Sequence, residues 1–476
     1  MAFQSLSFPV FLAVTAAVCL AAGRGSRRRA MALLFAAGCV FYLWPMTRHA
    51  GEGLCILLAG MAVTWLAARQ IRTGRRGKGV FLAALVWHLG VLLSFKYVNF
   101  FSGGAFGPAW APLGLSFFTF QQIWYLKEVY TGQWTGADTG TEFCLYSLFF
   151  PAVSSGPILR PGAFLPQLRG EKFLRPDGQD LAAGLYAICM GTIKKVLLAD
   201  SFGVVVNNGW SRLADLSAPA AWLVILGYSL QLYFDFSGYC DIAAGAARLL
   251  GLRLPVNFDS PYRSTSVGGF WKRWHMTLTA FLRECVYFPL GGSRGGAWRT
   301  CRNIFIVYLV SGWWHGAGWT FLLWGALHGV AQVMERLAGD RLDRVPRAVR
   351  WCVTFAFVNL AWVFFRAPDV GSGVELLTAA VSGGLVKPEP WLLEGLFSKE
   401  TGAIRLLLPA LKPWMNVGRL ALLYGAGLLA AFWPRNVIRA MEDFRPTLWR
   451  GAVLTALTVW SVLSFTGITT FIYSNF

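Results

Sequence analysis

Uncharged apolar runs alternate with short basic segments along the whole chain. The runs cover residues 8–22, 30–44, 54–67, 80–93, 143–155, 220–234, 351–365, 420–433 and 452–473. Several of them are shorter than the ~20 residues that cross a bilayer unaided, which predicts tilted, broken or re-entrant helices shielded by their neighbours. The pattern therefore predicts an all-α polytopic membrane protein with roughly eleven membrane segments.

The composition agrees with this pattern. Hydrophobic residues make up 56% of the 476 residues and charged residues 14%, an apolar fraction above that of a water-soluble domain of this length. No internal repeat, low-complexity linker or soluble domain is evident, so we expect a single integral-membrane domain over residues 1–476. Residues 366–419 lack a clear membrane run, and we expect an external segment there with one or two amphipathic helices at the interface.

Basic residues are concentrated in short segments between the runs. Lys and Arg outnumber Asp and Glu by 43 to 23, which gives a formal net charge of +20. Clustered positive charge is disfavoured in translocated loops, so segments 24–29, 69–78, 340–350 and 435–450 are expected on the cytoplasmic side. These segments are separated and form no continuous stripe, which argues against nucleic-acid binding.

The same rule predicts the positions of the termini. The first run follows residues 1–7, which contain no Lys or Arg, and precedes Arg24, the reverse of the charge order in a cleavable signal peptide. We expect a retained first helix with its N-terminus on the outer face. The last run leads outward from Arg450, so the C-terminus and Tyr473 are expected on the outer face as well.

The middle of the chain, residues 228–329, differs from both ends because charged and aromatic residues interrupt membrane-like sequence. It holds three of the five histidines: His275, His315 and His328. Ionisable residues are costly inside a membrane and usually serve a function there. We therefore predict that residues 228–329 form the catalytic section.

His315 is the most informative of these histidines. It follows Trp314 and precedes Trp319, and glycines at positions 316 and 318 allow a close approach of the backbone. A neutral imidazole in such surroundings can act as a base toward a hydroxyl group. The alternative is a buried histidine that only bonds a neighbouring helix.

The other two histidines carry weaker signals. His275 lies close to Trp271 and Arg273, where it could instead be an interfacial anchor. His328 follows His315 by thirteen residues, a spacing that does not place the two on one helical face, and we expect it to be structural.

A metal centre and a phosphate cradle are the other chemical alternatives. Ligation by His275, His315 and Asp235 has no support from spacing, because no HExxH motif is present, and the nine cysteines form no CxxC pair. We predict no metal. The loop "GGSRGG" with Arg294 lacks a Walker lysine; it could meet an anionic donor such as coenzyme A, or it could be a topology signal.

Several motifs together resemble the membrane-bound O-acyltransferase family. The resemblance is to its bacterial branch, which includes the alginate O-acetylation and teichoic acid D-alanylation membrane proteins. It covers most of the chain and is carried by "GLSFFTFQQIWYLKEVYTG", "FFPAVSSGPILRP", "LYFDFSGYCDIAAGAARLLG", "FDSPYRSTSVGGFWKRWHMTLTAFLRECVYFPLGGSRGG", "WWHGAGWTFLLWGALHG" and "WVFFRAPD".

The resemblance implies a ring of tilted, partly re-entrant helices around a central tunnel. An acyl thioester, expected to be acetyl-CoA, would enter from the cytoplasm as a substrate with no bound cofactor. His315 matches the catalytic histidine, and His275 matches the second histidine of an "FWxxWH" motif, where it would orient a reactant or stabilise the oxyanion. The candidate substrate-binding residues are Trp271, Arg273, Trp314, Trp319, Asp235 and Arg294.

The stretch "FIYSNF" at residues 471–476 is similar to an aromatic C-terminal motif of extracellular acylation systems in this branch. The resemblance implies that Tyr473 accepts the acyl group and relays it outward. Its hydroxyl needs a base because a phenol with a pKa of about 10 is almost wholly protonated at neutral pH. The alternative is an aromatic belt residue at the end of a spanning helix.

The sequence thus predicts an O-acetyltransferase of the bacterial inner membrane that modifies an exported polysaccharide or peptidoglycan. The expected partners are membrane lipid and a periplasmic or extracellular esterase-fold acetyltransferase that completes delivery. The alternatives are transfer of D-alanyl or another short acyl group, a transporter or flippase of envelope precursors, and a scaffold without activity. The absence of an evident inverted repeat argues against the transporter.

Overall fold

The computed structural model describes residues 3, 5, 7–44, 47–74, 77–106, 110–136, 138–433 and 435–464. Tyr473 and the rest of segment 471–476 lie outside the described residues. Helices dominate the described part of the chain, and it contains no strand. The expectation of an all-α protein is confirmed.

The helices fall into three groups along the chain. The N-terminal group comprises α1 (Ser7–Gly25), α2 (Arg27–Leu43), α3 (Ala50–Arg72), α4 (Gly77–Lys96), α5 (Val98–Phe101), α6 (Leu115–Tyr130), α7 (Gly140–Ser147), α8 (Phe150–Val153), α9 (Pro161–Phe164) and η1 (Leu165–Arg169). The middle group comprises α10 (Gly178–Ile193), η2 (Lys194–Ala199), α11 (Asp200–Ser211), η3 (Leu213–Asp215), α12 (Ala218–Leu249), η4 (Pro261–Arg263), α13 (Val267–Trp271), α14 (Met276–Leu282), η5 (Arg283–Tyr287), α15 (Ala297–His315) and α16 (Trp319–Ala338). The C-terminal group comprises η6 (Gly339–Arg344), α17 (Arg347–Arg366), α18 (Val370–Ser382), η7 (Pro390–Leu393), α19 (Ser398–Leu407), η8 (Pro409–Trp414), α20 (Met415–Phe432), α21 (Val437–Glu442) and α22 (Leu448–Leu463).

Six helical segments of the described chain are long and apolar enough to cross a membrane. They are Ser7–Gly25, Ala50–Arg72, Gly77–Lys96, Gly178–Ser211, Arg347–Arg366 and Pro409–Phe432. The sequence predicted roughly eleven membrane segments. The apolar run 143–155 accounts for part of the difference, because it is broken into the short helices α7 and α8, with Pro151 in the first turn of α8. The chain is a multi-pass membrane protein.

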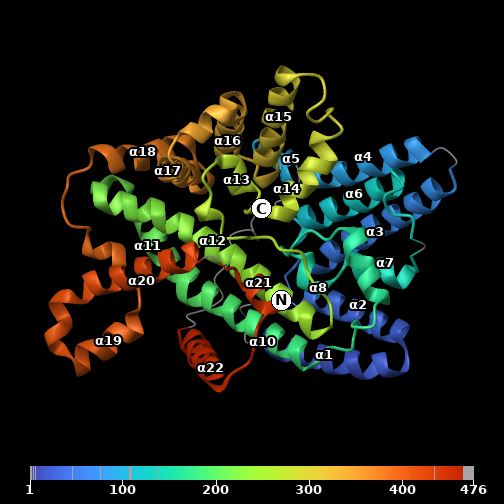
Figure 1. Ribbon diagram of the computed structural model, residues 1–476, viewed down its shortest axis with the longest axis horizontal. Coiled ribbons are helices and arrows are strands. Elements are labelled where there is room, and N and C mark those ends of the chain that lie inside the picture. Colours follow the sequence, from blue (N-terminus) through green and yellow to red (C-terminus); the bar gives the residue numbers. More distant parts are fainter. Residues whose placement is uncertain are drawn as a thin grey trace.

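Helix α12 runs through the middle of the molecule, as Figure 1 shows, and is buried along most of its length. Glycines allow α10 to approach it closely. A Cβ atom added at Gly191 would lie 2.5 Å from the carbonyl oxygen of Gly238, and one at Gly184 would lie 3.0 Å from that of Gly245. Small residues at such contacts are typical of helix packing inside membranes.

Three ion pairs also join the α10 to η2 segment to α12. Lys194 contacts Asp241 at 2.6 Å, and Lys195 contacts Asp235 at 2.8 Å. The third, between Arg248 and Asp180, measures 2.9 Å. All these side chains are largely buried, and each charge has an opposite charge beside it, as burial in a membrane protein requires.

The remaining helices surround this centre. Figure 1 shows α1–α4 and α6 on one side of α12, α17–α20 on the other, and α13–α16 between them. Segment 366–419 contains α18 and α19, the short helices η7 and η8 and the start of α20, and the membrane-length segment Pro409–Phe432 begins inside it. The position of segment 366–419 outside the membrane stays a prediction.

Candidate active site

The helices α15 and α16 form a hairpin with His315 at its tip. His315 is the last residue of α15, and α16 begins at Trp319. Close packing of the two helices requires glycine at their contact, since a Cβ atom added at Gly312 would lie 2.4 Å from the carbonyl oxygen of Phe321 and 3.1 Å from the Cα atom of Gly325. The hairpin therefore holds His315 on a rigid support.

Aromatic rings surround the His315 side chain, which is only 2% exposed. Its ring centroid lies 4.6 Å from that of Trp314, 5.1 Å from that of Trp324 and 5.0 Å from that of Phe365. These contacts come from α15, α16 and α17. An imidazole held this way has little freedom to rotate and lies in surroundings of low polarity.

His275 is fully buried and begins α14 in an unusual backbone conformation. Its φ of 43° lies in the left-handed region, which costs a non-glycine residue about 1 kcal/mol or more. The side chain explains how this conformation is held. Its Nδ1 atom lies 3.2 Å from Oδ1 of Asn257, and the same oxygen accepts hydrogen bonds from the backbone N–H and the hydroxyl of Thr277.

These contacts fix the tautomer of the neutral His275 ring. The backbone N–H of Thr277 can only donate, so the atom of Asn257 that faces it is the oxygen. The Nδ1 atom of His275 must therefore carry the proton that this oxygen accepts. The Nε2 atom of the neutral ring is then an acceptor of hydrogen bonds.

Trp314 lies between the two histidines. Its ring centroid is 6.3 Å from that of His275 and 4.6 Å from that of His315. On its other side it packs against Phe117 and Phe120 of α6, with centroid distances of 5.8 and 5.1 Å. The structure therefore brings His275 and His315 together around one indole, although forty residues separate them in the sequence.

His328 completes the aromatic cluster from α16. Its Nδ1 atom accepts a hydrogen bond of 3.2 Å from the indole N–H of Trp271, and its ring lies 5.0 Å from that of Trp324. Trp271, predicted to bind substrate, thus contacts His328 and Trp324 inside the cluster. These contacts are of the kind expected of a structural histidine, and that role for His328 stays a prediction.

Helix α6 extends along the site, starting beside the histidine cluster. Phe117 packs against His275 and Phe120 against Trp314, whereas Trp124 and Lys127 contact the carboxylate of Glu284 at 3.3 and 3.0 Å. Ten residues separate position 117 from position 127, which corresponds to about 15 Å along a helix. Beyond Lys127 the same helix ends at Tyr130, beside Phe81 near the start of α4 and the basic segment 69–78.

A pocket of about 410 Å³ opens beside the C-terminal half of α6. Its lining includes the three arginines Arg160, Arg253 and Arg283 and the two residues that follow His275, Met276 and Thr277. Because Thr277 bonds Asn257, and Asn257 bonds His275, one layer of side chains separates the pocket from the histidine. The pocket thus leads from a basic rim toward the aromatic cluster.

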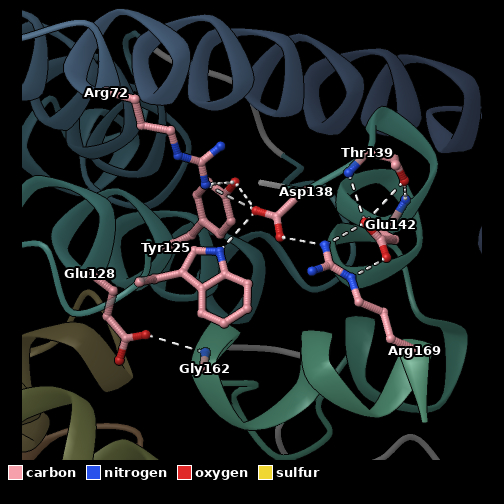
Figure 2. Close-up of polar contacts among 9 residues, drawn as sticks. Arg72, Tyr125, Glu128, Asp138, Thr139, Glu142, Gly162 and Arg169 are labelled. Atoms are coloured by element: carbon pink, nitrogen blue, oxygen red, sulfur yellow. Dashed lines mark hydrogen bonds and ion pairs between the residues drawn. The ribbon is translucent and has the colours of Figure 1, made fainter. Parts of the chain in front are cut away.

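One wall of the pocket is formed by the segment around α9, and buried carboxylates hold it. Glu128 accepts hydrogen bonds from Arg160 and, at 3.3 Å, from the backbone N–H of Gly162, which Figure 2 shows. Arg160 also reaches Glu284 at 3.4 Å and lies over the ring of Trp124. The guanidinium group of Arg160 is therefore held at the rim in a fixed orientation.

A second cluster holds the far end of the same wall (Figure 2). Asp138 lies between Arg72 at 3.1 Å and Arg169 at 3.7 Å, and it accepts a hydrogen bond of 2.7 Å from Tyr125. Arg169 also donates to Glu142 at 2.7 Å. This hydrogen bond lowers the pKa of Glu142 and raises the pKa of Arg169.

The structure does not bring all predicted substrate-binding residues to the histidines. Asp235 is held in an ion pair with Lys195. Arg294 is exposed in the loop before α15, and the 19 residues of that helix place His315 about 27 Å from its start. Trp319 is 68% exposed, and Arg273 bonds the backbone oxygen of Asp259 at 3.3 Å.

Sequence reasoning missed several residues that the structure places in the cluster. Asn257, Thr277 and Trp324 contact the histidines or their partners, and Lys96 and Tyr97 reach the end of α15 from α4. The sequence offered one indication of these residues, the polar Asn257 directly before the "FDSPYR" stretch. Lys96 was recognisable only as a charged residue at the end of an apolar run.

The described residues contain no group of three or more His, Cys, Asp or Glu side chains that could hold a metal ion. The proposed set of His275, His315 and Asp235 does not form such a group. The site therefore presents imidazoles, indoles and a basic pocket as its chemical groups.

Comparison with known proteins agrees with this arrangement. The sequence profile of the membrane-bound O-acyltransferase family matches residues 141–367. The chain is 36% identical over 338 residues to the peptidoglycan O-acetyltransferase of Helicobacter pylori, which covers 63% of this chain and 64% of that protein. It is 34% identical over 401 residues to the probable alginate O-acetylase AlgI of Pseudomonas aeruginosa, covering 80% of this chain and 74% of that protein.

A more distant relative is the teichoic acid D-alanyltransferase of Bacillus subtilis, 28% identical over 46% of this chain and 57% of that protein. Together these matches show that the chain belongs to the membrane-bound O-acyltransferase family. The family resemblance expected from the motifs is confirmed, and with it the class of the protein, an acyltransferase.

Proposed function

We propose that this protein is an O-acyltransferase of the bacterial inner membrane that moves an acetyl group from a cytoplasmic thioester to a hydroxyl presented from the outer side. The transfer would serve O-acetylation of an exported polysaccharide or of peptidoglycan. One observation carries the proposal: His275 and His315 are buried around Trp314, and a pocket with a basic rim reaches the residues next to His275.

In the proposed reaction His315 is the base. It takes the proton of the acceptor hydroxyl, whose oxygen attacks the thioester carbonyl. The new C–O bond forms as the C–S bond breaks, and the proton passes from His315 to the leaving thiolate. The products are an ester and a free thiol, so the step needs no oxidant, metal or further reactant.

His275 orients a reactant in this proposal. Its neutral ring presents Nε2 as an acceptor, because Nδ1 donates to Asn257. An acceptor can hold a hydroxyl group but cannot stabilise a developing oxyanion, which needs hydrogen-bond donors. The tautomer therefore favours orientation of a hydroxyl over the oxyanion role, the other alternative that the sequence left open.

The donor would occupy the pocket of about 410 Å³. The guanidinium groups of Arg160, Arg253 and Arg283 suit the phosphates of a nucleotide thioester such as acetyl-CoA, and the pocket ends beside Thr277, near His275. The pocket lies on the side of the basic segment 69–78, which the positive-inside rule assigns to the cytoplasm.

Tyr473 would be the first acceptor and would relay the acetyl group to an esterase-fold transferase outside the membrane. This step rests on the motif in segment 471–476. The proposal includes the predicted location of both termini on the outer face of the membrane. The names of the relatives favour an acetyl group on an envelope polymer, since two of them are described as O-acetylating proteins. D-alanyl transfer is the second candidate, favoured by the weaker match to the B. subtilis protein.

The test uses the purified full-length protein and radiolabelled acetyl-CoA, with mass spectrometry of the C-terminal peptide. We expect an acetyl group on Tyr473 that disappears in His315→Ala and in Tyr473→Phe. Thioester cleavage that depends on His315 but leaves Tyr473 unmodified would keep the acyltransferase and remove the relay. No His315-dependent cleavage of either an acetyl or a D-alanyl thioester would overturn the proposed chemistry and favour the transporter or the scaffold.

A further inference from the structure

The end of α15 that carries His315 is held by another helix. An α-helix leaves its last four carbonyl groups without partners inside the helix. The helix ends at His315, and the next residue, Gly316, is extended, with a φ of −173°. The carbonyl oxygen of Trp313 accepts a hydrogen bond from the hydroxyl of Tyr97, and that of Trp314 accepts one of 2.6 Å from Nζ of Lys96.

Both donors come from the end of α4, more than two hundred residues earlier in the chain. Lys96 is the last residue of that helix, and Tyr97, which is 5% exposed, follows it directly. The ring of Tyr97 also packs against that of Trp313, with 5.0 Å between the centroids. The two adjacent side chains thus replace the cap that α15 does not form from its own sequence.

Lys96 also packs against the aromatic ring at this end of the helix. Its Nζ atom lies 5.5 Å from the ring centroid of Trp314, in addition to the hydrogen bond with the Trp314 carbonyl. The C-terminal end of a helix carries a partial negative charge, so hydrogen-bond donors are favourable there.

We propose that Lys96 and Tyr97 are positioning residues for His315: their hydrogen bonds to the last carbonyl groups of α15 fix the end of that helix and, with it, the imidazole. The inference rests on the proposed function in that His315 is the base.

Three variants test these hydrogen bonds. Lys96→Met keeps the length of the side chain and removes its donor. Lys96→Arg restores a donor, and Tyr97→Phe removes the other hydrogen bond while it leaves the ring. In Lys96→Met we expect kcat to fall about 10- to 100-fold while the KM for acetyl-CoA stays within about twofold, because a misplaced base affects the chemical step.

The split between kcat and KM, with rescue by the conservative variant, distinguishes positioning from a merely structural role. Lys96→Arg should regain most of kcat. Tyr97→Phe should lose a few-fold in kcat with an unchanged KM for acetyl-CoA.

A readout independent of turnover keeps this inference separate from the proposed function. Diethyl pyrocarbonate modifies neutral imidazole, and mass spectrometry gives the rate of its reaction with His315 at a fixed pH. A changed rate in Lys96→Met that Lys96→Arg restores supports the inference, even if wild type shows no acetyl transfer. His315-dependent transfer with unchanged kcat and unchanged modification in Lys96→Met would overturn it while the proposed function stands. If Lys96→Met does not fold, a wild-type kcat together with wild-type modification of His315 in Tyr97→Phe would also overturn it.

Discussion

At the scale of single residues, the chemistry depends on how the buried polar atoms are hydrogen-bonded. Asn257 shows this most clearly. Its side-chain oxygen accepts three hydrogen bonds, and it thereby sets which nitrogen of His275 carries the proton. A buried polar group that loses its partner costs more than the hydrogen bond contributed, so such residues should be sensitive to substitution.

Asn257→Leu is therefore expected to reduce acetyl transfer about 10- to 100-fold, because His275 loses the partner that fixes its tautomer and its orientation. It should also lower the free energy of unfolding by about 1–3 kcal/mol. Initial rates and thermal unfolding in detergent measure the two effects. The matched control is Cys240→Ala, which removes only the weak acceptor of the Asn257 amide group. Equal rates in wild type and Asn257→Leu would contradict the proposed role of His275.

Glu142 provides a prediction on pH. Its pKa is lowered, chiefly by the hydrogen bond from Arg169, so the stabilisation is present above the unfolded-state pKa of about 4.3 and is lost as the pH falls through the lower folded-state value. Glu142→Gln should destabilise the protein by about 1 kcal/mol at pH 7, and the difference from wild type should vanish below about pH 4. Thermal unfolding across this range measures it. Glu375→Gln, at an exposed position on α18, is the control, and a difference that grows with acidity would refute the prediction.

At the scale of helices, close packing of α15 on α16 fixes the position of His315. A methyl group at position 312 would press against the backbone of Phe321 and Gly325. Gly312→Ala should thus cost about 1–3 kcal/mol in stability and reduce kcat. Gly318→Ala on the same hairpin is the control, since a Cβ atom there meets nothing closer than 3.4 Å. Comparable thermal stability of both variants would contradict this prediction, because it would show that α15 and α16 can move apart without loss of stability.

The sequence predicted most of the long helices but few of the contacts between them. The apolar runs predicted most long helices, because a membrane demands their length and composition. The motifs predicted that His275 and His315 are important. They did not predict the contacts of Lys96 with α15, because the partners lie more than two hundred residues apart. Arg294 was expected in the site because its loop is basic, and Trp319 because it is close in sequence to His315, but the length of α15 separates Arg294 from the histidine and Trp319 is largely exposed.

At the scale of the whole molecule, the pocket and the histidine cluster are neighbours, with Thr277 and Asn257 between them. Ala280→Trp places a large ring in the pocket without touching either histidine. We expect the apparent KM for acetyl-CoA to rise about tenfold or more, while modification of His315 by diethyl pyrocarbonate stays as in wild type. Leu185→Trp, at a position of α10 that is 55% exposed, should change neither. An unchanged KM in Ala280→Trp would exclude this pocket as the donor site.

The hairpin of α15 and α16 has a consequence for how enzymes of this design can vary. The distance of His315 from the base of the hairpin equals the length of one helical leg, and each added residue moves the imidazole by about 1.5 Å but also turns it by about 100°. Insertions that preserve its direction must therefore come as nearly whole turns of three or four residues in both legs. A lineage can change this distance only in steps of about 5 Å, which leaves the loops at the base of the hairpin as the place for finer adjustment.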